Sequence, residues 1–173
     1  NLNPEDFNDD TLGRALDRLY EHNPTNIFMR VSLNARKVME LEGNYYHLDT
    51  TSMSVHGDYE HSEDDRVPVK ITHGKSKDGR NDLKQYMVSM ITTSEADLPV
   101  WIDALSGNTS DKTHFREVTK KYAEQLAENK EMIYFIMDSA GYAAKNIREM
   151  PTIVKWISRV PETINMAKKL LLE

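Results

Sequence analysis

The stretch Met132-Ile133-Tyr134-Phe135-Ile136-Met137 decides the fold class of this chain, because it is the only run of six consecutive apolar residues. A run that is this short and this apolar is typical of a strand buried on both faces of a sheet. Asp138 follows directly, so its carboxylate is expected at the carboxyl end of that strand. Asp49 has a similar setting after Tyr45-Tyr46-His47-Leu48. Two acidic residues at two strand ends indicate a metal site.

The first 43 residues have the pattern of two helices. Apolar residues recur at helical spacing from Leu12 to Leu19, and Asn23-Pro24 ends this pattern. A second helix is predicted from Asn26 to Leu41. We therefore expect residues 1–43 to form an N-terminal helical extension and residues 44–173 to form the main domain.

Strand and helix patterns alternate after residue 44. The predicted order is strand, strand, strand, helix, strand, helix, strand, helix, over residues 45–55, 85–93, 98–105, 111–129, 132–138, 143–147, 152–160 and 162–172. Three antiparallel strands followed by two helix-linked parallel strands give a mixed five-stranded α/β sheet. The first and fourth strands would be central neighbours, so Asp49 and Asp138 would lie side by side although 89 residues separate them in the sequence.

Two isolated carboxylates that lie close together repel, so the pair is best explained by a divalent cation between them. The sequence contains no cysteine, which leaves oxygen and imidazole as the available ligands. Hard oxygen ligands favour Mg²⁺ or Mn²⁺ over Zn²⁺. Two such ions about 4 Å apart can activate an attacking oxygen and stabilise the leaving oxygen of a phosphodiester.

Each of the two acids also has a purely structural interpretation. Asp138 could cap a helix that begins at Ala140. Asp49 could form a side-chain turn ahead of Thr50. From the residues alone, the capping role of Asp138 is the more common one.

The charge of the chain is unevenly distributed. The net charge is -6, and residues 1–65 carry 14 acidic against five basic residues. Residues 66–84 reverse this balance, with six basic against two acidic residues. Such a basic segment is what contacts with DNA phosphates require, although lysines also serve solubility. The candidate DNA-binding residues are Lys75, Lys77, Arg80 and Lys84.

Four segments of the chain resemble the catalytic core of DDE transposases from bacterial insertion sequences, which belong to the ribonuclease H-like, or retroviral-integrase, superfamily. The resemblance covers about residues 45–160, with the four segments in the family's order. They are His47-Leu48-Asp49-Thr50-Thr51-Ser52, Gly74-Lys75-Ser76-Lys77-Asp78-Gly79-Arg80-Asn81-Asp82-Leu83-Lys84-Gln85, Gly107-Asn108-Thr109-Ser110-Asp111 and Met137-Asp138-Ser139-Ala140-Gly141-Tyr142.

The resemblance implies a ribonuclease H-like fold in which Asp49 and Asp138 are the first two acids of a catalytic triad. It implies cleavage and strand transfer of DNA phosphodiesters with Mg²⁺ or Mn²⁺, two ions in the complete enzyme. It also implies a homo-oligomer assembled on DNA, with transposon ends and target DNA as substrates.

The chain departs from the family where the third acid is due, a Glu within a Tyr/Arg/Glu/Lys signature on the helix after the last core strand. Glu162 and Glu173 lack the expected neighbours. We expect the third acid beyond Glu173, so that the core is truncated and this piece alone is almost inactive. The alternatives are a ribonuclease H-like nuclease without strand transfer, and a non-catalytic DNA-binding remnant of a transposase.

No stretch of the sequence approaches the roughly 20 apolar residues that span a bilayer, and no signal-peptide pattern is found near residue 1. We therefore expect a cytoplasmic bacterial protein without a membrane partner, associated with the nucleoid when it is bound to DNA. The DNA end sequence, the target preference and the oligomeric state have no signature in the sequence.

Overall fold

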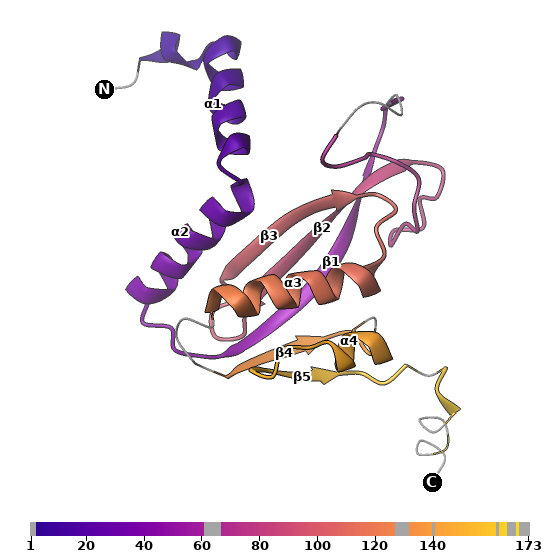
Figure 1. Cartoon of the computed structure of the whole chain (residues 1–173). Helices are drawn as coiled ribbons and strands as arrows, with labels where there is room; N and C mark the ends of the chain where they lie inside the picture. Colours follow the sequence, from indigo (N-terminus) through magenta and orange to yellow (C-terminus); the bar gives the residue numbers. More distant parts are fainter. Residues whose placement is uncertain are drawn as a thin grey trace.

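The computed structural model describes residues 3–60, 67–126, 132–139, 141–161, 163–165 and 169. Figure 1 shows a sheet with one long helix across it and a helical arm at the N-terminal end. Along the chain, the described elements are η1 (Pro4–Phe7), α1 (Asp9–Glu21), α2 (Pro24–Val38), β1 (Tyr45–Val55), β2 (Lys84–Thr93), β3 (Pro99–Ser106), α3 (Asp111–Leu126), β4 (Ile133–Met137), α4 (Ala144–Arg148) and β5 (Val154–Ser158).

The five strands form one mixed sheet in the order β3-β2-β1-β4-β5. β1, β2 and β3 are antiparallel neighbours, whereas β4 pairs in parallel with both β1 and β5. The predicted fold class, a mixed five-stranded α/β sheet with three antiparallel strands followed by two helix-linked parallel strands, is confirmed. β1 and β4 are central neighbours, as the order of elements predicted.

One face of this sheet carries the core. Side chains alternate between buried and exposed along β1, so Tyr46 and Leu48 face inward while Tyr45, His47 and Asp49 face outward. The helix α3 lies across the inner face (Figure 1) because its apolar residues recur at helical spacing. These buried residues of α3 are Phe115, Val118, Tyr122 and Ala123.

The helix α2 also joins the core, through Met29, and it packs along the edge strand β3. Its second anchor is Arg36, which donates to the carbonyl of Gly43 at 2.7 Å and lies over the Tyr46 ring. By contrast, α1 buries none of its residues and projects away from the sheet (Figure 1). The predicted division of the chain at residue 43 stays a prediction.

The outer face of the sheet is largely open to solvent in the described part of the chain. Met90 on β2 and Ile102 on β3 are exposed there, as is Tyr45 on the central strand β1. The predicted helix over residues 162–172 lies largely outside the described residues, as does the predicted end of α3 near residue 129. None of the described helices is long and apolar enough to cross a membrane.

Candidate functional site

The pairing of β1 with β4 brings the two candidate acids together. The paired positions run from Tyr45 with Tyr134 to Leu48 with Met137, and Asp49 and Asp138 are the next residue on each strand. Both acids are exposed, at positions that continue the outer face of the sheet. Neighbouring strands lie about 4.8 Å apart, so two carboxylates at matched positions can reach one cation.

Asp49 lies in the middle of β1, and its predicted place at a strand end is wrong. β1 continues to Val55 and pairs with β2 over this whole length. β4 ends at Met137, so the side of β1 that faces β4 has no ladder partner beyond Leu48 among the described residues. Asp49 therefore lies at the point of β1 where the neighbouring strand β4 ends while the neighbouring strand β2 continues.

The start of the next helix excludes the helix-capping role considered for Asp138. The next helix, α4, begins at Ala144, and its capping residue is Ala143, which makes no side-chain cap. Asp138 instead fixes the end of its strand through its backbone, since its carbonyl accepts from the Ser158 hydroxyl at 2.7 Å. This hydrogen bond ties the carboxyl ends of β4 and β5 together beside the acid pair.

Lys77 reaches Asp49 from a loop 28 residues further along the chain. Its ammonium lies 3.7 Å from Asp49 Oδ1 and donates to the carbonyl and, at 3.0 Å, the hydroxyl of Thr50. The backbone N–H of Lys77 donates to the buried Ser52 hydroxyl at 2.9 Å. Sequence reasoning missed this contact because a loop lysine has no periodicity that indicates its partner.

A cleft of about 1290 Å³ opens next to the acid pair. Asp138 lines it together with Lys75 and Lys77, whereas Arg80 and Lys84 do not. Much of the wall comes from three parts of the chain, which are residues 74–77, residues 107–110, and Asp138, Ser139 and Tyr142. The remaining lining residues are Met87, Pro161, Thr163 and Ile164.

Two glycines hold this wall in place by close backbone approach. A Cβ on Gly74 would lie 1.9 Å from the carbonyl oxygen of Gly107, and a Cβ on Gly107 would lie 2.0 Å from that of Gln85. The N–H of Gly107 donates to the carbonyl of Lys70 at 3.0 Å, and Thr72 bridges to Gln85. The segment of residues 70–77, which contains Lys75 and Lys77, is thereby attached to β2 and to the end of β3.

Arg80 and Lys84 each contact another group of the protein. The guanidinium of Arg80 forms a two-pronged pair with Asp82, through Nε to Oδ1 at 2.9 Å and Nη2 to Oδ2 at 2.8 Å. This hydrogen-bonded cation lowers the pKa of the exposed Asp82 carboxyl to about 2. The Lys84 ammonium donates to the carbonyl of Asp58. DNA contact by Lys75, Lys77, Arg80 and Lys84 stays a prediction.

The donor set fits a hard divalent cation, because two carboxylates follow paired positions on one exposed face. Within the described residues, no group of three or more His, Asp or Glu side chains could hold a metal ion. Glu162 and Glu173, the two acids considered for the third position, lie outside the described residues. Metal binding by Asp49 and Asp138 stays a prediction.

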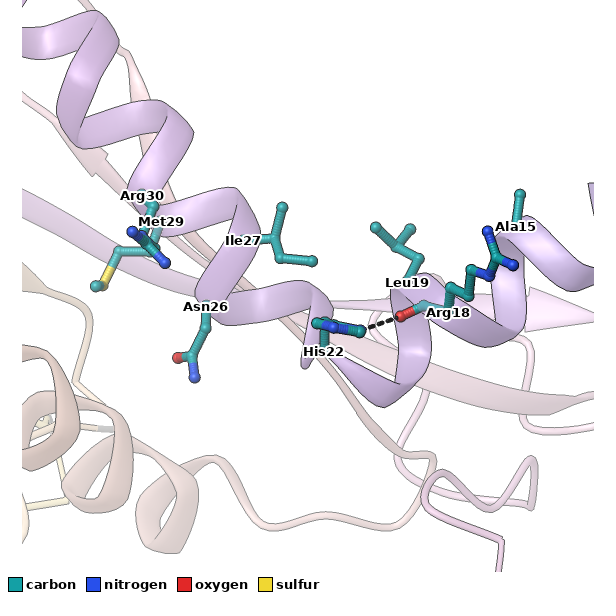
Figure 2. Close-up of a pocket in the computed structure, with 8 residues that line it drawn as sticks. All are labelled: Ala15, Arg18, Leu19, His22, Asn26, Ile27, Met29 and Arg30. Atoms are coloured by element: carbon teal, nitrogen blue, oxygen red, sulfur yellow. Dashed lines mark hydrogen bonds between the residues drawn. The ribbon is translucent and has the colours of Figure 1, made fainter.

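A second hollow, about 760 Å³ in volume, lies between α1 and α2 (Figure 2). Leu19 and Ile27 project to the same side of it, and the His22 ring contacts the carbonyl of Arg18 at 2.8 Å. Its lining contains no carboxylate, so it is not a candidate for the metal site. The lining residues are Ala15, Arg18, Leu19, His22, Asn26, Ile27, Met29 and Arg30.

Comparison with known proteins adds a likeness of fold. A family model described as a domain of unknown function (DUF4277) matches residues 1–33. No curated protein sequence matches the chain. Similar solved structures include a Mos1 transposase paired-end complex with left transposon end, at 13% identity and a TM-score of 0.42 over 78% of this chain. A piggyBac transposase synaptic complex with hairpin DNA is similar at 10% identity and a TM-score of 0.46 over 76% of this chain.

The chain spans only part of the proteins that it resembles in fold. It covers 40% of that Mos1 chain and 26% of the piggyBac chain. A Mos1 mariner paired-end complex with Mn is similar at 12% identity and a TM-score of 0.40, over 80% of this chain and 41% of that one. At such identities the likeness concerns the fold alone.

Proposed function

We propose that this chain is the catalytic core region of a DNA transposase of the DDE type, from a bacterial insertion sequence, which cleaves and rejoins DNA phosphodiesters with Mg²⁺ or Mn²⁺. The observation that supports the proposal is the strand register, in which Asp49 and Asp138 directly follow the last paired positions of β1 and β4. The four sequence segments that resemble this family also meet there, since three of them line the cleft and the fourth contains Asp49.

In this proposal each group at the site has one task. Asp49 and Asp138 hold the cation, which when bound would polarise the phosphodiester and activate the attacking hydroxyl or water. Lys75, exposed in the cleft wall, binds backbone phosphates of the DNA and orients the strand over the acids. Ser158 positions Asp138 through its backbone carbonyl. A third acidic ligand, a second ion and an oligomer on paired DNA ends belong to the same proposal.

Cation binding tests the acid pair directly. Titration with Mn²⁺ through the millimolar range is expected to raise the melting temperature, by roughly 3–5 °C when the cation reaches about ten times its dissociation constant. Asp49→Asn should abolish this rise, because the amide keeps the shape of the side chain and removes the charge. The measurement is thermal unfolding followed by circular dichroism.

Asp97→Asn is the matched control for this experiment. Asp97 lies in the turn between β2 and β3 and has a positive φ of 50°, which asparagine also tolerates. This variant removes the same charge away from the acid pair and should respond to Mn²⁺ as the wild-type protein does. The proposal is contradicted if Mn²⁺ does not raise the melting temperature of the wild-type protein, or if it still raises that of Asp49→Asn.

The salt dependence of DNA binding tests the lysines of the cleft. Lys75→Gln is expected to reduce the slope of log K against log[salt] by about one, because one phosphate contact is lost. Arg80→Gln should change the slope less, since Asp82 already neutralises that guanidinium. Fluorescence anisotropy with a labelled duplex gives the slope. Lys37→Gln on α2 serves as the charge control. If Lys75→Gln and wild type give equal slopes, Lys75 does not contact DNA phosphates.

A further inference from the structure

The Lys77 ammonium lies beside the carboxylate that the proposed function assigns to the cation. It is 3.7 Å from Asp49 Oδ1, and it is fixed there by the carbonyl and hydroxyl of Thr50. A divalent cation on Asp49 would lie within a few ångströms of this ammonium. Two positive charges at that separation repel each other, so the ammonium and the cation cannot both stay on Asp49 without a cost in free energy.

The loop around Lys77 is built to deliver the side chain to this place. The buried Ser52 hydroxyl of β1 accepts the backbone N–H of Lys77 at 2.9 Å. On the other side, Ser76 Oγ accepts from the N–H groups of Asp78 and Arg80, at 3.2 and 3.1 Å. Since the backbone is held from both sides, the ammonium stays within reach of Asp49.

The ion pair itself is weak enough to be exchanged. The side chains of Lys77 and Asp49 are 37% and 81% exposed, and exposed ion pairs contribute little to stability. A cation that binds both Asp49 and Asp138 has two carboxylate ligands, whereas the ammonium forms its ion pair with Asp49. The cation can therefore displace the ammonium, but it does so at reduced affinity.

We propose that Lys77 is the resident counter-ion of Asp49 and competes with the divalent cation for it, thereby setting the affinity of the metal centre. The inference rests on the proposed function for the presence of a cation site. In the absence of the cation the ammonium neutralises Asp49. When the cation binds, the ammonium moves away while its backbone stays attached to β1, and its positive charge is released into the cleft.

Cation affinity is measured on the whole chain by titration with Mn²⁺, with free Mn²⁺ read from its electron paramagnetic resonance signal. Lys77→Met keeps the length of the stem and removes the charge, so the dissociation constant for Mn²⁺ is expected to fall about two- to fivefold, because the cation no longer has to displace an exposed ion pair. Lys77→Arg keeps the charge and should bind Mn²⁺ about as weakly as wild type. Lys70→Met removes the same charge from the same segment, outside the cleft lining, and should also match wild type.

The outcomes separate this inference from the proposed function. If Asp49→Asn loses Mn²⁺ binding but Lys77→Met binds exactly as wild type does, competition by Lys77 is refuted and the cation site stands. If neither wild type nor Lys77→Met binds Mn²⁺, both proposals fail. Binding by Lys77→Met alone supports the competition and places the wild-type affinity outside the measured range.

Amine labelling gives a second readout that does not depend on affinity. Acylation of Lys77 by a succinimidyl ester, followed by peptide mass spectrometry, should become faster when Mn²⁺ is added to wild type, because the ammonium leaves its partners. In Asp49→Asn the contacts with Thr50 remain and the cation has lost a ligand, so the rate should not respond to Mn²⁺. If the acylation rate of Lys77 in wild type does not change when Mn²⁺ binds, the inference is overturned.

Discussion

Replacing Phe135 with alanine is expected to lower the free energy of unfolding by about 3–5 kcal/mol. Phe135 is fully buried at the middle of β4. Its ring packs against those of Tyr46 and Tyr122, at centroid distances of 6.1 and 6.0 Å. Alanine would remove this contact and leave a cavity where strands β1 and β4 meet α3. Equilibrium denaturation in urea at 25 °C gives the change.

Ile157→Ala is the control for the loss of apolar surface. Ile157 lies on β5, next to β4 in the same sheet, and is 55% exposed. Truncation of a half-exposed side chain is expected to cost less than about 1 kcal/mol. Similar losses for the two variants would mean that the inner face of the sheet is not the side that carries the core.

Gly107→Ala is expected to destabilise the protein by about 3 kcal/mol or more, although only one methyl group is added. The new Cβ would lie 2.0 Å from the carbonyl oxygen of Gln85 and 2.6 Å from that of Thr72. Both obstacles are backbone carbonyl oxygens, and each accepts from the N–H of the other's residue, at 3.1 Å for Thr72 to Gln85 and 2.9 Å for Gln85 to Thr72, so neither can move alone. The same urea denaturation measures the effect.

Gly13→Ala provides a matched control with the opposite sign. Gly13 lies inside α1, and a Cβ there meets nothing within 4 Å. Alanine is the better helix former by about 0.5–1 kcal/mol, so this variant should be slightly stabilised. A neutral Gly107→Ala variant would show that the segment of Thr72 is not packed against β2 as described.

The order of strands and the meeting of β1 with β4 could be predicted because they follow from local patterns and simple connection rules. The apolar run at Ile133–Met137 gave the buried strand, and its place after a meander gave its neighbour. The predicted strand over residues 45–55 is confirmed and contains Asp49, so only the description of Asp49 as a strand-end residue is wrong. A strand ends where its partners end, and the partners of β1 on its two sides end at different residues.

The candidate site was predictable only in part, for a related reason. Asp49 and Asp138 lie on strands, so their relative placement follows from the sheet. Lys77 and Arg80 belong to a loop, where partners depend on backbone geometry that has no period in the sequence. Both are paired with carboxylates in the structure, one at the acid pair and one within the loop.

The matched register of β1 and β4 also limits how this sequence can change in length. Side chains alternate between the two faces of a sheet, so insertion or deletion of a single residue within either strand would turn its aspartate toward α3. The long connection between the two acids imposes no such restriction, because its loops can lengthen at little entropic cost. Length variation among related proteins should therefore gather between β1 and β4 and spare the four paired positions that precede the acids.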